Sequence, residues 1–162
     1  MVDFLVIGSY NIVTYKNTFP LIKDRIIRIG WNRIGEFSDG SRFGNIVWFS
    51  TVGGGIPPEL LLKKDCDIDN LDRFDNYDAI NINKIEEIPD GYYGEIGVPV
   101  TFLERWNPEQ FELIGLLTDN KGDGEYFFNG TKTYVDEKHR NRKSGVVNGK
   151  MLFDKLLIKK KN

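Results

Sequence analysis

The stretch MVDFLVIGSYNIVTYKNTFPLIKDRIIRIG, residues 1–30, decides the fold class. Its residues 4–8, FLVIG, are an apolar run ending in glycine, which is typical of a strand buried on both faces of a parallel sheet. Residues 11–24 have helix-compatible apolar spacing, which Pro20 shortens or kinks, and residues 26–30 predict a second strand. This order indicates a parallel α/β unit. Because a buried strand needs pairing on both edges, residues 4–8 require neighbouring strands and covering helices.

Several further strands are predicted downstream of this unit. Residues 46–49 form an apolar strand after a polar, glycine-rich stretch with a turn signal at Asp39-Gly40, which indicates two antiparallel strands. Residues 51–78 are mostly loop, because glycines and prolines open the segment and acids close it. The remaining apolar runs predict strands at residues 79–82, 111–117, 126–135 and 150–158.

Two local signals refine this reading of the second half. Thr101 and Glu104 have the spacing of a capping box, which predicts a short helix at residues 101–105. Asn148-Gly149 predicts a hairpin turn. We expect the last strand, residues 150–158, to close the sheet. The fold class is therefore α/β, a mixed, mainly β sheet with few helices.

Length and composition indicate one domain over residues 1–162, with 40% apolar residues, 13% aromatic residues and a net charge of -2. The aromatic residues either fill the core or stack on bases. No apolar run is long enough for a membrane span and the start lacks signal-peptide features, so we expect a cytoplasmic protein that does not contact a membrane.

The sequence contains no complete motif for metal binding, phosphate binding or nucleophilic catalysis. Residues 65–70, DCDIDN, alternate carboxylates as a calcium loop does, but Asn70 replaces the required glycine. One histidine and one cysteine cannot form a zinc cage. Residues 51–58, TVGGGIPP, have prolines where a phosphate-binding helix would begin. We therefore predict no catalytic, cofactor-binding or metal-binding residue in this chain.

Four blocks together resemble the C-terminal half of the EcoRI-type adenine-specific DNA methyltransferases. They are residues 4–30, residues 42–51 (RFGNIVWFST), residues 74–116 (FDNYDAININKIEEIPDGYYGEIGVPVTFLERWNPEQFELIGL) and residues 147–161 (VNGKMLFDKLLIKKK). The resemblance spans most of the chain. Residues 74–116 are the most specific block, because such an irregular string of turns and aromatic residues rarely recurs by chance.

The resemblance implies a Rossmann-like fold and transfer of a methyl group from S-adenosylmethionine to adenine N6, in restriction-modification. Family enzymes hold the cofactor on a glycine-rich turn with an acidic residue, and receive a flipped adenine on an Asn-Pro-Pro-aromatic loop. Both elements are expected upstream of residue 4. This chain alone is therefore expected to lack the cofactor and to be inactive. In this reading, residues 4–8 form the strand after the catalytic loop, and their missing neighbours lie in the N-terminal half.

The resemblance also implies that this half recognises double-stranded DNA. Residues that follow predicted strands, or that lie in the basic loop at residues 136–145, are the candidates because phosphate and base-edge contacts need exposed polar and aromatic side chains. The candidates are Tyr10, Asn11, Tyr15, Lys16, Trp31, Asn32, Arg33, Lys138, Arg140, Arg142 and Lys143. For each group an ordinary role stays open: helix capping by Asn11, inward packing of Tyr15 and Trp31, and a solvated basic loop.

Two other functions stay open at this point. A half-domain standing alone can act as a binding or inhibitor protein of a nucleic-acid-handling enzyme, through acids between Asp65 and Asp78 that mimic DNA. An exposed sheet edge can also pair with a second copy of the chain. The expected partners are therefore DNA together with either a separate N-terminal half or a second copy.

Overall fold

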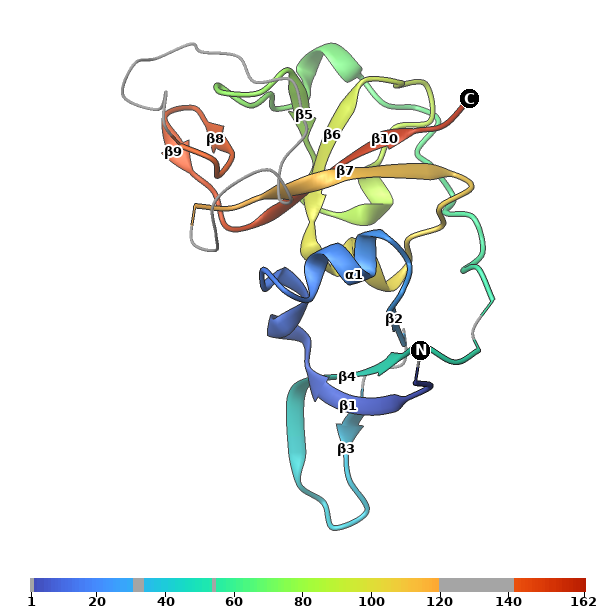
Figure 1. The fold of residues 1–162 in the computed structure, drawn as a ribbon. Helices are drawn as coiled ribbons and strands as arrows, with labels where there is room; N and C mark the ends of the chain where they lie inside the picture. The colour runs from blue at the N-terminus through green and yellow to red at the C-terminus, as the bar shows by residue number, and fades with distance from the viewer. Residues whose placement is uncertain (1, 31–33, 54, 120–141) are drawn as a thin grey trace.

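The computed structural model describes residues 2–30, 34–53, 55–119 and 142–162. Their strands form two four-stranded sheets and one small hairpin, joined by short helices (Figure 1). The first sheet lies in the N-terminal third of the chain, and the second sheet is built from later strands. The fold is mixed and mainly β, with few short helices, as the sequence predicts.

The first sheet is organised around one long strand. Its members are β1 (Leu5–Ser9), β2 (Arg28–Ile29), β3 (Ile34–Glu36) and β4 (Arg42–Ser50). All three shorter strands pair antiparallel with β4. The antiparallel pair predicted around residues 46–49 is therefore confirmed as β3 and β4.

The predicted parallel unit at residues 4–30 is wrong in its pairing and in the burial of its first strand, because Leu5, Val6 and Ile7 are exposed. The order strand, helix, strand is correct, because the 3-10 helix η1 (Tyr10–Thr14) and helix α1 (Phe19–Lys23) lie between β1 and β2. However, β1 and β2 lie on opposite sides of β4 and do not pair with each other. The strand β4 is nine residues long, whereas β2 is only two, so β4 offers β1 much more backbone to pair with.

The second sheet has the order β5-β6-β10-β7. Its strands are β5 (Ala79–Asn81), β6 (Glu95–Pro99), β7 (Phe111–Leu117) and β10 (Lys155–Lys160). The pair β5 and β6 is parallel, and the other pairs are antiparallel. The strands predicted at residues 79–82 and 111–117 are confirmed. The expectation that the last strand closes the sheet is wrong: β10 is fully apolar at Leu156–Ile158 and lies in the centre.

Turns and short helices agree with the sequence in part. The Asn148-Gly149 turn is confirmed, with positive φ at both residues, and joins β8 (Val146–Val147) to β9 (Lys150–Met151). The helix predicted at residues 101–105 is the 3-10 helix η4 (Val100–Glu104). Its N-cap residue is Pro99 and no side chain caps it, so the capping box predicted for Thr101 is wrong. The strand predicted at residues 126–135 lies outside the described residues.

Two further 3-10 helices lie in loops: η2 (Ile68–Asn70) between the two sheets, and η3 (Ile85–Glu87) between β5 and β6. The described residues of 51–78 otherwise form loop, as predicted. In the described part of the chain, no helix is long and apolar enough to cross a membrane.

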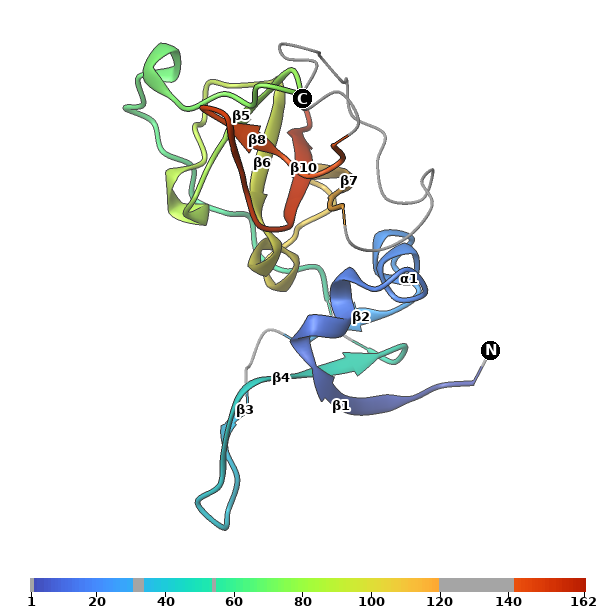
Figure 2. The same ribbon diagram turned by 90° about the vertical axis from the view of Figure 1, so that its left-hand side faces the viewer.

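The larger apolar core joins the two sheets through α1 and η1. Val47 and Phe49 of β4 pack with Val13 and Phe19, and this cluster continues into β6, β7 and β10. Figure 2 shows α1 and η1 between the first sheet and the rest of the molecule. Two hydrogen bonds cross the same junction: the Tyr10 hydroxyl donates to the Val100 carbonyl, and Lys23 Nζ donates to the Ile114 carbonyl.

Candidate nucleic-acid interface

The junction between the sheets forms a hollow of about 810 Å³ that gathers several of the predicted site residues. Tyr10 and Asn11 line it from η1, and Arg142 lines it from the segment before β8. Arg142 is more than 130 positions away from Tyr10 and Asn11 in the chain. Tyr15 and Lys16 are exposed just after η1, outside the lining. Five further candidates lie outside the described residues: Trp31, Asn32, Arg33, Lys138 and Arg140.

Asn11 is held at the rim by its local structure. Ser9 caps η1 by accepting a hydrogen bond from the Asn11 backbone amide at 3.3 Å. The side-chain oxygen of Asn11 accepts a hydrogen bond from Asn45 Nδ2 at 2.8 Å. Asn11 is exposed, so its side-chain NH₂ is accessible as a hydrogen-bond donor. Asn11 does not act as the helix cap, because Ser9 takes that role.

Tyr10 and Tyr15 have opposite environments. Tyr10 is buried, and its hydroxyl donates to the Val100 carbonyl at 2.7 Å. A buried, bonded tyrosine fixes the start of η1 and therefore the position of Asn11 beside it. Tyr15 is 48% exposed, so the alternative that it packs inward is wrong.

Asp119 organises the basic side of the hollow. Its carboxylate accepts hydrogen bonds from the backbone amides of Lys143 and Ser144 at 2.5 and 3.1 Å. The Arg142 guanidinium lies 3.4 Å from the same carboxylate and is 53% exposed. An exposed ion pair of this length contributes little stability, so the guanidinium can turn to another anion at small cost.

Lys155 contributes a second cation at the base of the hollow. It is buried, and its Nζ donates to the Ile82 carbonyl at 2.9 Å and to Asn83 Oδ1 at 3.0 Å. Burial lowers the pKa of Lys155 to about 8, because the charged form loses hydration. At neutral pH the ammonium is still mostly protonated, so two cations, Lys155 and Arg142, line the hollow together with the carboxylates of Asp119 and Asp154.

Residues 151–155, from the end of β9 to the start of β10, also line the hollow. Met151 is 55% exposed and Phe153 is 95% exposed, and both line the hollow. An exposed aromatic ring next to cations is a stacking surface for a base. Sequence reasoning missed Phe153 because it lies in the run at residues 150–158 that predicts a strand. It missed Asn45 because that residue stands directly before the strand predicted at residues 46–49. The only available signal for Phe153 was the polar residue Asp154 that interrupts the run before β10.

The acidic segment at residues 65–78 contributes nothing to the lining of this hollow. Several of its carboxylates have internal partners: Asp67 accepts from Asn70, Asp75 accepts from the Gly149 amide, and Asp78 pairs with Arg73. No group of three or more metal-binding side chains occurs among the described residues. The carboxylates of this segment therefore lie apart from the hollow, while its Phe74, Asn76 and Tyr77 are buried.

The described residues of the glycine-rich stretch 51–58 lie in irregular chain. In its described residues the segment contains no helix or strand, and Pro57 and Pro58 have no regular secondary structure. Gly53 has a φ of +67° and no heavy atom within 4 Å of a Cβ built on it. A phosphate or carboxylate site of this type needs a helix that begins directly after the turn, and none begins here.

Comparison with known proteins gives a consistent result. The family model described as "Adenine-specific methyltransferase EcoRI" matches residues 31–161. The type II methyltransferase M.EcoRI of Escherichia coli is 34% identical, over 98% of this chain and 50% of its own length. The type II methyltransferases M.MgeORF184P of Mycoplasma genitalium and M.MpnI of Mycoplasma pneumoniae are 30% and 29% identical, over 57% of their lengths. No solved structure matches significantly. The chain spans about half the length of the curated relatives it matches.

Proposed function

Because the chain belongs to the EcoRI-type family of adenine-specific methyltransferases, we propose that it is the DNA-recognition half of such an enzyme. In this proposal it corresponds to the C-terminal half, and the hollow between the two sheets contacts duplex DNA. The complete enzyme transfers a methyl group from S-adenosylmethionine to adenine N6 in a short duplex site.

The proposal rests on one observation: Asn11, Arg142 and Phe153 line the same hollow. Each side chain offers a different contact that DNA recognition uses. The guanidinium binds a phosphate, the amide donates to a base edge, and the ring stacks on a base. In this proposal Tyr10 positions Asn11, while Tyr15, Lys16 and Lys143 extend the surface. The candidates outside the described residues, Trp31, Asn32, Arg33, Lys138 and Arg140, remain part of the proposed interface.

We propose further that the chain alone does not methylate. Its sequence contains no Asn-Pro-Pro-aromatic tetrapeptide. In the Asn-Pro pair it does contain, the Asn107 amide is buried, donates to the Pro57 carbonyl and accepts from the Glu109 and Gln110 amides. An amide with these internal partners is not available to accept an adenine amine. The glycine-rich residues at 51–58 also do not fit a cofactor site, so the cofactor is assigned to the part that the chain does not span.

A duplex titration tests this function. The purified chain is titrated with a labelled duplex that contains adenines, at low and at moderate salt, with and without S-adenosylmethionine. We expect binding that weakens as salt rises, because released counterions accompany each phosphate contact, and that does not respond to the cofactor. Absence of binding at low salt contradicts the recognition role, and an affinity that changes with cofactor contradicts the assignment of the cofactor to the other half.

An inhibitor that mimics DNA through its acidic segment is the alternative function, and the structure favours it less. DNA mimicry needs carboxylates that are free to stand in for phosphates, and three of the six carboxylates at residues 65–78, those of Asp67, Asp75 and Asp78, have a partner within the chain. The same titration separates the two functions, because a DNA mimic does not bind the duplex.

A further inference from the structure

Helix α1 ends at a residue whose backbone conformation is unusual for its side chain. Arg25 follows the helix with a φ of +60°. Its amide donates to the Ile22 carbonyl at 3.0 Å, and the next amide, that of Ile26, donates to the Leu21 carbonyl at 2.8 Å. These two hydrogen bonds form a Schellman motif, in which the residue with positive φ is usually glycine. An arginine there is strained, because positive φ brings its Cβ close to the following carbonyl oxygen.

The Arg25 side chain lines a second hollow, which has a volume of about 660 Å³. A hollow of this size accommodates a small-molecule ligand. Within the part of the chain that the structure describes, the Arg25 guanidinium has no hydrogen-bond or ion-pair partner. The strain at Arg25 is therefore not explained by a contact within the chain, and its charge is available to a bound anion.

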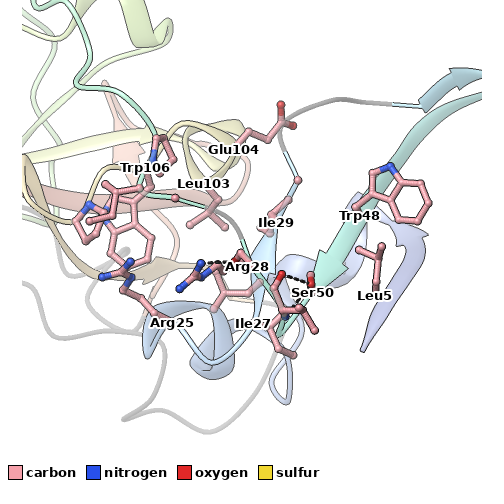
Figure 3. Close-up of a pocket in the computed structure, with 18 of the residues that line it drawn as sticks. Leu5, Arg25, Ile27, Arg28, Ile29, Trp48, Ser50, Leu103, Glu104 and Trp106 are labelled. Atoms are coloured by element: carbon pink, nitrogen blue, oxygen red, sulfur yellow. Dashed lines mark hydrogen bonds between the residues drawn. The ribbon is translucent and has the colours of Figure 1, made fainter. Parts of the chain in front are cut away.

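The walls of the second hollow are mainly apolar and include two indole rings. Figure 3 shows Arg25 and Trp106 toward one end of the hollow, and Trp48 and Leu5 toward the other. The Nε1 of Trp106 donates to the Phe111 carbonyl at 2.9 Å, which fixes the orientation of this ring. Further apolar lining comes from Ile27, Ile29, Leu103, Pro57 and Pro58. Flat, oriented rings among apolar side chains favour a ligand with an aromatic body.

The described residues that line the second hollow have one positive charge in excess. Arg25 and Arg28 supply two cations, and Glu104 supplies one carboxylate. The Arg28 guanidinium donates to the Gly53 carbonyl, so part of its donor capacity is already used. Glu104 lies well apart from Arg25 in Figure 3. Arg25 is therefore the group that can hold an anion, and the single excess charge matches a monoanion such as a carboxylate better than a phosphate, which carries nearly two charges.

We propose that the second hollow binds a small aromatic carboxylate. The aromatic body lies among the apolar walls that include Trp48 and Trp106, and the carboxylate accepts hydrogen bonds from the Arg25 guanidinium, whose planar fork matches its geometry. The arginine in the place of a glycine after α1 is then explained by the ligand that it holds. This inference goes beyond the proposed DNA interface and does not rest on it, because the two hollows share no described lining residue.

The test is a calorimetric titration of the full chain with two matched probes. Naphthoate carries a flat ring system and one carboxylate, and naphthalenemethanol carries the same rings without a charge. We expect naphthoate to bind with a Kd about tenfold or more below that of naphthalenemethanol, because a hydrogen bond to a charged group is worth at least this factor. Equal affinities of the two probes overturn the proposal, and so does the absence of binding by both.

Two variants make the test specific. Arg25→Gly is expected to raise the Kd for naphthoate by about tenfold or more and to leave the Kd for naphthalenemethanol unchanged. The same variant is expected to keep or raise the Tm, because glycine is the residue that the Schellman motif favours. Arg42→Ala is the matched control, because Arg42 is an exposed arginine outside both hollows, and it is expected to change neither Kd. An unchanged Kd for naphthoate in Arg25→Gly overturns the proposal.

The ligand site and the DNA interface fail independently. Arg25 does not line the hollow that contains Arg142, so Arg25→Gly is expected to retain the wild-type affinity for duplex DNA. Weaker duplex binding by this variant overturns the proposal, because the guanidinium then serves a phosphate. If naphthoate binds through Arg25 and the duplex does not bind, the proposed recognition role is wrong and the ligand site stands. If the duplex binds and naphthoate does not, the reverse holds.

Discussion

Gly145 lies directly against the ring of Phe74, so that a Cβ atom at position 145 would stand 2.2 Å from Cε1 of that ring. A Cβ atom at Gly97 of β6 would likewise stand 2.3 Å from the same ring. The ring of Phe74 thus occupies the space that side chains at positions 97 and 145 would need. It belongs to the smaller apolar core.

The first prediction concerns this contact. Gly145→Ala is expected to lower the free energy of unfolding by about 1–3 kcal/mol, because the ring is buried and must shift to admit the methyl group. Chemical denaturation measures the change. Gly44→Ala is the control, since no heavy atom lies within 4 Å of a Cβ at that position. Equal stability of both variants would show that the ring moves freely.

The second prediction concerns Asn76, whose buried amide joins two distant segments. Its Nδ2 donates to the Ser144 carbonyl at 2.9 Å, and its Oδ1 accepts from the Val146 amide at 3.0 Å. Asn76→Ala is expected to lower the free energy of unfolding by about 1–3 kcal/mol for each backbone group left without a partner. Asn70→Ala, which removes an exposed amide, is the control in the same denaturation experiment. A loss no greater than that of the control contradicts this role.

The third prediction concerns pH and Lys155. The pKa of Lys155 is lowered from 10.5 to about 8 by burial, so between these values the unfolded chain holds a proton that the folded protein has lost. The free energy of unfolding therefore rises with pH across this window, and the full penalty of the buried charge is present below it. Relative to Lys155→Met, the wild type should gain stability from about pH 7 to about pH 10. A constant difference between the two proteins contradicts the lowered pKa.

The fourth prediction concerns Arg142 and rests on the proposed DNA interface. Arg142→Ala is expected to weaken duplex binding and to reduce the slope of log affinity against log salt by about 0.9, the value for one lost phosphate contact. Arg73→Ala is the matched control, because Arg73 is 51% exposed and also pairs with a carboxylate. An unchanged slope for Arg142→Ala removes this residue from the interface.

The fifth prediction concerns Phe153. If its ring stacks on a base, Phe153→Ala weakens duplex binding by about 1–3 kcal/mol with an unchanged salt slope, because stacking releases no counterions. Leu61→Ala is the control, since both side chains are 95% exposed. Equal affinities of the two variants for the duplex would show that the ring of Phe153 does not stack on a base.

The candidate site was predictable only in its separate parts. The residue types of Asn11 and Arg142 mark them as polar candidates, but their meeting in one hollow depends on the Tyr10–Val100 bond and on the bonds that Asp119 makes with residues 142–144. Phe153 was not predictable as an exposed ring, because its apolar neighbours indicate a buried strand.

The sequence by itself determined the features that depend on neighbouring residues. Apolar runs located β4, β5 and β7, and the Asn148-Gly149 pair located a turn that needs positive φ at both positions. Only the tertiary structure decided which strands pair. It placed β4 between β1 and β2, and β10 between β6 and β7. Pairing of this kind depends on which faces can be buried together across a long stretch of chain, and local periodicity carries no information about the distant partner.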